Sequence, residues 1–181
     1  MRNRFPDIVG AARDGDPAAL EALYRELAPA VLGYLRAQRS RNPEDLASET
    51  FVGVVRALPR FRGDERDLRS WVFSIAHRRL IDERRALLRR REEPIDAANL
   101  PRAPMGDVEE EAIAAVGTRW AHEAVSGLTG DQRDVILLRV LADLSVEDVA
   151  RILDKRVGAV KSLQRRALLS LARQIDREGV S

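Results

Sequence analysis

A proline-containing acidic segment, residues 92–111, is the feature that most constrains the fold of this chain. It holds three prolines and seven acidic residues against a single basic residue, Arg102. Prolines remove backbone donors and clustered like charges repel, so a packed helix or strand of any length is not expected there. The chain therefore predicts two folded domains, residues 1–91 and 112–181, joined by a flexible acidic linker.

Both domains are expected to be helical. Apolar residues recur every three or four positions, and β-branched residues never form the alternating run that is typical of a strand. Asp16-Pro17 and Asn42-Pro43 each look like an N-cap followed by a proline in the first helical position. The sequence thus predicts an all-α protein of two small helical domains.

Three details of the N-terminal domain follow from local sequence. We expect Pro29 to kink or interrupt the helix that starts at Pro17. Residues 59–68 carry proline, glycine and alternating charges, which is typical of a loop. Ser70 is then expected to cap a long helix.

The formal net charge of +2 hides a strong segregation of sign along the chain. Residues 56–91 contain twelve arginines against five acids, and residues 155–177 contain seven bases against one acid. Any one block could be a solvated helix face, but two basic blocks on separate helical units favour nucleic acid as a partner.

The residue types present argue against an enzyme or a metalloprotein. There is no cysteine, which excludes disulfides and thiolate metal sites. The two histidines, His77 and His122, belong to no recognised metal or acid–base arrangement, so no catalytic residue, cofactor or metal is predicted. We expect His77 at the surface or facing phosphate, and His122 on a helix beside Trp120. The N-terminus lacks the apolar core of a signal peptide and no segment could span a bilayer, so a cytoplasmic location is expected.

Residues 144–171 predict a helix-turn-helix. Ser145 is placed as an N-cap with Asp148 three residues later, close to a capping box, and residues 154–156 make a tight turn. The second helix of such a pair is free to enter a major groove, although a plain hairpin with a basic solvent face is the alternative. Apolar spacing on that helix includes Leu168 and continues to Leu171. The outward-facing side chains are Arg156, Ala159, Lys161, Ser162, Arg165 and Arg166.

The N-terminal domain carries a family resemblance. The stretch from NPEDLASETF through LRSWVFSIA to IDERR resembles region 2 of extracytoplasmic-function (ECF) sigma factors, and residues 128–162 resemble region 4. The resemblance implies a factor that binds the β′ and β subunits of core RNA polymerase, recognises the −10 and −35 promoter elements and assists promoter melting. The resemblance also implies an anti-sigma protein as a possible further partner.

The resemblance also implies roles for individual residues. Asp45 and Glu49 would dock on core polymerase. A loop would hold a base extruded from the −10 element, and the following helix would contact the strand along one face. These −10 residues are Arg62, Gly63, Asp64, Arg78, Arg85 and Arg89, while the outward residues of the helix-turn-helix would read the −35 element.

Two interpretations stay open beside this one. Trp71 and Phe73 could stack on bases, but aromatic residues at this spacing are more often part of a core. A LuxR-like regulator that binds DNA without core polymerase would also contain the C-terminal helix-turn-helix, although its sensing domain would need strands that residues 1–91 do not suggest.

Overall fold

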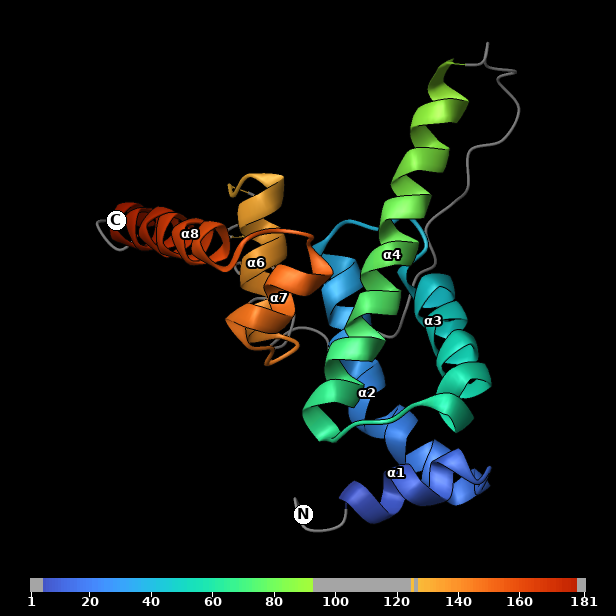
Figure 1. Ribbon diagram of the computed structural model, residues 1–181. Helices are drawn as coiled ribbons and strands as arrows, with labels where there is room; N and C mark the ends of the chain where they lie inside the picture. The colour runs from blue at the N-terminus through green and yellow to red at the C-terminus, as the bar shows by residue number, and fades with distance from the viewer. Residues whose placement is uncertain (1–4, 93–124, 126, 179–181) are drawn as a thin grey trace.

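The computed structural model describes residues 5–92, 125 and 127–178, and the regular elements within these ranges are all helical (Figure 1). The predicted all-α class is therefore confirmed. In chain order the elements are α1 (Phe5–Arg13), α2 (Pro17–Ala37), α3 (Pro43–Ala57), the short 3-10 helix η2 (Leu58–Arg60), α4 (Glu65–Glu92), α6 (Gly130–Val140), α7 (Val146–Ile152) and α8 (Val157–Glu178).

Helix α2 begins where the sequence predicts, because the Asp16 side chain accepts a hydrogen bond from the Ala18 backbone N–H at 2.9 Å. Of the two outcomes expected at Pro29, a kink or an interruption, the interruption is wrong, since α2 continues through the proline to Ala37. Leu27 and Val31, on either side of the proline, are both buried in the core. Their packing holds the helix together across the hydrogen bond that the proline cannot make.

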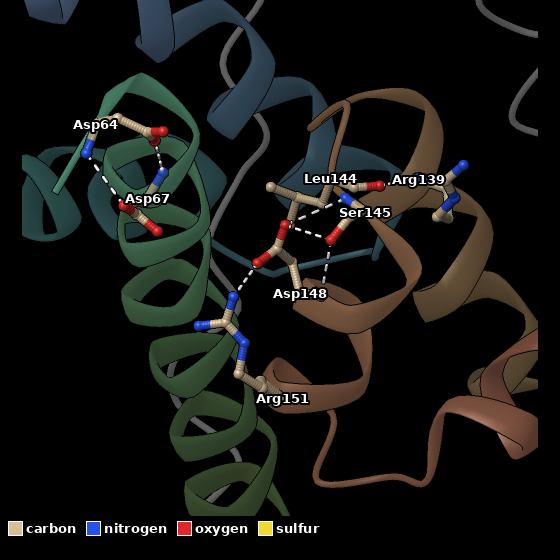
Figure 2. Close-up of polar contacts among 7 residues, drawn as sticks. All are labelled: Asp64, Asp67, Arg139, Leu144, Ser145, Asp148 and Arg151. Atoms are coloured by element: carbon tan, nitrogen blue, oxygen red, sulfur yellow. Dashed lines mark hydrogen bonds and ion pairs between the residues drawn. The ribbon is translucent and has the colours of Figure 1, made fainter.

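Helix α4 begins at Glu65, so the expectation that Ser70 caps it is wrong. Instead the Asp67 N–H donates to the Asp64 side chain and the Asp64 N–H donates to the Asp67 side chain, both at 3.0 Å (Figure 2). This reciprocal pair satisfies N–H groups of the first turn, as in a capping box. Ser70 is buried one turn further along.

The C-terminal helices α6 and α7 each begin with a capping box. Thr129 pairs reciprocally with Gln132 before α6, and Ser145 pairs with Asp148 before α7, which confirms the box predicted there (Figure 2). The predicted linker beyond Glu92, and the expected positions of Trp120 and His122, lie outside the described residues.

The two halves of the chain share one buried apolar cluster. Helices α1–α4 form a bundle, α6 packs beside α2, and α7 packs beside α4, while α8 points away from the bundle (Figure 1). The cluster takes Phe73 and Leu80 from α4, Tyr34 from α2, Val135 from α6 and Val149 from α7, each fully shielded from solvent. Phe73 is thus a core residue, as the sequence favours.

His77 is buried in this structure, not exposed as predicted. Its Nδ1 lies 2.7 Å from the hydroxyl of Tyr34, and only 9% of the residue is accessible. Burial lowers the pKa of His77, with Arg84 adding to that effect and Asp134 opposing it. Periodicity alone could not show this, because the partner tyrosine lies on a different helix.

Stability should fall as the pH drops below about 6.5, the ordinary pKa of histidine. Folding lowers the pKa of His77, so the unfolded chain takes up a proton first and is favoured as acidity rises. The groups facing the ring are Tyr34, Asp134 and Arg84. Thermal unfolding between about pH 7.5 and about pH 5.5 should show this loss for the parent chain and a flatter profile for His77→Gln.

The matched control for that measurement is His122→Gln, because these are the two histidines of the chain. It should retain the parent profile. If His77→Gln loses stability with acid as steeply as the parent, the buried histidine is not the titrating group.

Candidate nucleic-acid interface

The turn between α7 and α8 has the geometry that a helix-turn-helix needs. The N–H of Lys155 donates to the carbonyl of Ala150 at 2.9 Å and the N–H of Asp154 donates to that of Arg151 at 3.4 Å. Together with the positive φ of Asp154, 51°, these bonds form a Schellman motif, which ends one helix abruptly. The chain reverses within a few residues, and α8 can begin at Val157.

Helix α8 buries one stripe and exposes the rest. Val160 and Ala167 are completely buried against the neighbouring helices. The six residues predicted to read DNA are all exposed: Arg156, Ala159, Lys161, Ser162, Arg165 and Arg166. Leu168 was expected on the apolar side but is 51% exposed, because it lies just outside the buried stripe.

Contacts outside α8 fix how its exposed face is presented. Lys155 reaches back to Asp131 at the start of α6, with 3.0 Å between Nζ and Oδ2. Arg139 of α6 donates to the carbonyl of Leu144, in the segment that leads into α7 (Figure 2). The recognition helix is therefore carried by a supported three-helix unit.

The loop that precedes α4, residues 61–64, is shaped by its own side chains. Arg62 Nη1 donates to the carbonyls of Pro59 and Phe61 at 3.1 and 2.7 Å. Gly63 has a φ of +151°, and a Cβ placed there would come within 2.6 Å of the Asp67 Cβ. Asp64 caps α4. All three predicted pocket residues are exposed, and each also has a structural reason to be present.

An aromatic pair joins this loop to α4. The rings of Phe61 and Trp71 stack with centroids 5.1 Å apart at an interplanar angle of 23°. Both residues are partly buried. Trp71 packs against the core but keeps part of its surface exposed, so it is neither a fully buried core residue nor a fully exposed stacking residue. A stacked platform beside an exposed loop is suited to holding an unpaired base.

Some arginines of α4 are exposed to solvent, and others are hydrogen-bonded to neighbouring helices or turns. Arg78, Arg85 and Arg89 are exposed, as their shared spacing predicts. Arg85 lies 3.7 Å from Asp82, but both side chains are about two-thirds exposed, so this pair is weak. Arg84, by contrast, donates to Gln38 from a half-buried position. The exposed set is available to backbone phosphates.

Helix α3 carries the predicted acidic face. Asp45 and Glu49 are both exposed one turn apart. Arg79 of α4 donates to Glu49 at 2.7 Å, which orients that carboxylate and ties α3 to α4. Val52, 48% exposed, follows on the same face and adds an exposed apolar side chain that sequence reasoning missed.

A second carboxylate contact escaped prediction. Glu83 accepts hydrogen bonds from the Ser40 hydroxyl at 3.0 Å and from the Arg41 backbone N–H at 3.2 Å. It thereby anchors the turn between α2 and α3 onto α4. Nothing in the local sequence distinguishes Glu83 from a solvated acid, because its partners lie about forty positions away.

Within the described ranges, no group of three or more histidine, aspartate or glutamate side chains is placed to hold a metal ion. The helices of these ranges also include none that is long and apolar enough to cross a membrane.

Comparison with known proteins places this chain in a family. Sigma-70 region 2 matches residues 23–91, and sigma-70 region 4 matches residues 118–171. Two solved structures share the fold: CnrH in complex with the cytosolic domain of CnrY (TM-score 0.67, 20% identity, 96% of this chain and 97% of that one) and the sigma factor RpoE of Bartonella quintana in complex with the anti-sigma factor NepR (TM-score 0.63, 21% identity, 86% and 96%).

Related sigma factors align with this chain over almost its whole length. The ECF RNA polymerase sigma factor ShbA of Streptomyces griseus is 32% identical, with 94% of this chain and 97% of ShbA aligned. The ECF sigma factor SigD of Mycobacterium tuberculosis is 33% identical over 97% of this chain and 86% of SigD. A match to region 2 is not expected for a LuxR-like regulator, so that alternative is not favoured. The chain belongs to the ECF sigma factors of the sigma-70 family.

Proposed function

We propose that this sigma factor uses three separate surfaces to bring core RNA polymerase to a promoter. The exposed face of α3 docks on core polymerase, the loop 61–64 with the exposed arginines of α4 engages the −10 element, and α8 reads the −35 element. Residues 1–91 and 112–181 are the corresponding domains. The work of the factor is binding and local strand separation, without covalent chemistry, and we place it in the cytoplasm with its polymerase.

The observation that carries the proposal is the exposed face of α8. Six residues at the start of α8 and just before it are open to solvent, and four of them are cationic: Arg156, Lys161, Arg165 and Arg166. Arginine can bind the edge of guanine with two hydrogen bonds, and lysine suits phosphate. A helix that is supported by its neighbours and presents such a set of cations fits a major groove.

The −10 surface combines a shaped loop with a basic helix. Gly63 and the Asp64 cap keep the loop close to the start of α4. Arg78, Arg85 and Arg89 then continue as an exposed row along α4. Such a row binds the backbone of an opened strand without reading its sequence, whereas the loop and the Phe61–Trp71 stack offer a place for one extruded base.

The docking surface on α3 is acidic with an apolar neighbour. Asp45 and Glu49 would meet a basic patch on polymerase, and Val52 would be covered on binding. Charged rims govern the rate and specificity of association, while the apolar contact adds affinity. An anti-sigma protein is proposed as a further partner, on the precedent of RpoE and NepR.

Run-off transcription with purified core polymerase tests the function as a whole. The chain and core together should initiate from a cognate promoter fragment, and core alone should not. If the chain binds DNA by itself and never supports initiation by core, the regulator interpretation replaces this one.

Arg165→Ala and Arg85→Ala should weaken promoter binding in different ways. Loss of a base contact at Arg165 should cost about 1–3 kcal/mol on promoters with the preferred base and much less on others. Loss of a phosphate contact at Arg85 should weaken binding to all promoters alike and reduce the salt slope by about one unit. Holoenzyme binding is measured on a panel of −35 variants at several salt concentrations. An equal loss on every sequence for Arg165→Ala would count against base reading there.

Glu49→Lys should reduce affinity for core polymerase by roughly tenfold, because it places a cation against a basic patch and next to Arg79. The matched control is Glu21→Lys, the same charge change at an exposed position on α2 that pairs with Arg25. Affinity is measured with labelled core in solution. Comparable losses for the two variants would show a general charge effect and rule out docking through α3.

A further inference from the structure

Helix α3 contains an interior glycine that its backbone does not require. Gly53 lies within the regular helix Pro43–Ala57, and its φ is not in the left-handed region where glycine is favoured. Glycine in the middle of a helix is less stable than alanine, because it loses more conformational freedom on folding. The space beside the helix, rather than the backbone, therefore accounts for a glycine at this position.

That space is occupied by the guanidinium of Arg79 on α4, the helix that lies alongside α3 (Figure 1). A Cβ added at Gly53 would lie 3.2 Å from Arg79 Nη2 and 3.9 Å from Ile75 Cγ2. The first distance is shorter than ordinary van der Waals contact, so a larger residue would displace the guanidinium. Gly53 thus leaves room for Arg79 to reach across the surface of α3.

Arg79 reaches Glu49, which lies one turn before Gly53 on α3. Its Nη1 donates to Glu49 Oε2 at 2.7 Å. The Arg79 side chain is 32% exposed and its Nε is shielded from solvent, whereas the Glu49 side chain is 61% exposed. The arginine is therefore the anchored member of the pair. Among the described residues, none donates to the other carboxylate oxygen of Glu49, Oε1, so that oxygen can accept from a partner.

The neighbouring acid gives this bond a further effect. Asp45 and Glu49 are one turn apart on the exposed face that we propose docks on core polymerase, and like charges at this spacing repel each other. Without a cation beside it, the Glu49 side chain would turn away from Asp45 and exchange among several rotamers. The bond to Arg79 holds it in one of them.

We propose that Arg79 is a positioning residue for core docking, which fixes the Glu49 carboxylate in the rotamer that binds polymerase, and that Gly53 provides the space for it. This inference rests on the proposed function of α3. A side chain that is already ordered loses less conformational entropy on binding, which raises affinity without a new contact. An arginine that only neutralised Glu49 would instead weaken docking, so the sign of its effect distinguishes the two roles.

A double-mutant cycle on core affinity tests whether Arg79 acts through Glu49. Arg79→Met keeps an unbranched side chain over Gly53 and removes the hydrogen bond, while Glu49→Ala removes the carboxylate that is held. Arg79→Met should weaken the binding of labelled core by about threefold in the parent chain. It should have no further effect when Glu49→Ala is present, because no carboxylate is left to position.

The matched control is Arg69→Met. Arg69 is also on α4, has a side chain that is 20% exposed, and lies 3.7 Å from Glu26 of α2, so the change removes an ion pair of the same kind outside the proposed docking face. Both methionine variants should lower the thermal midpoint only slightly, because such pairs contribute little to stability. Core affinity should stay at the parent value for Arg69→Met.

Gly53→Val tests the space beside α3 while both charges stay in place. The added methyl groups would overlap the guanidinium, so core binding should weaken as it does for Arg79→Met. The positioning role is overturned if Arg79→Met tightens core binding, if it costs the same with and without Glu49, or if Gly53→Val leaves the affinity unchanged. Unchanged affinity for Glu49→Ala would instead reject docking through α3, and the positioning role with it.

Discussion

The buried face of α4 is the constraint on which the rest of this structure depends. Leu68, Val72, Ala76 and Leu80 are completely shielded from solvent along that face. It packs against α2 and α3 on one side and α7 on another. Burying these apolar side chains supplies much of the stability of the fold, and the same burial decides which arginines of α4 are left outside.

The proposed docking and DNA-binding surfaces are exposed because the opposite sides of the same helices are buried in the core. On α4, Arg84 turns inward to Gln38 while Arg85, the next residue, points to solvent. On α3, Glu49 is exposed but held by Arg79. Residues of the same type that are adjacent in sequence therefore face different surroundings, because each residue is rotated by about 100° around the helix axis from the one before it.

Much of the fold and of the interface could be predicted from sequence because the signals are local. The N-cap at Asp16, the capping box at Ser145 and the exposed row on α8 all depend on residues within one or two turns of each other. The predicted interruption at Pro29 and the predicted cap at Ser70 are wrong for a common reason. In each case a nearby competing interaction, the packing of Leu27 and Val31 or the cap at Asp64, outweighed the intrinsic preference of one residue.

The sequence by itself determined the helical class, the order of the two sigma regions and the basic face of α8. Each of these depends on the periodicity and charge of residues that are close together in the sequence. Only the tertiary structure decided that His77 is buried against Tyr34, that Glu83 anchors a turn, and that Gln38 meets Asp134. These contacts join residues between 43 and 96 positions apart. Their partners are set by how the helices pack, and no local pattern specifies that.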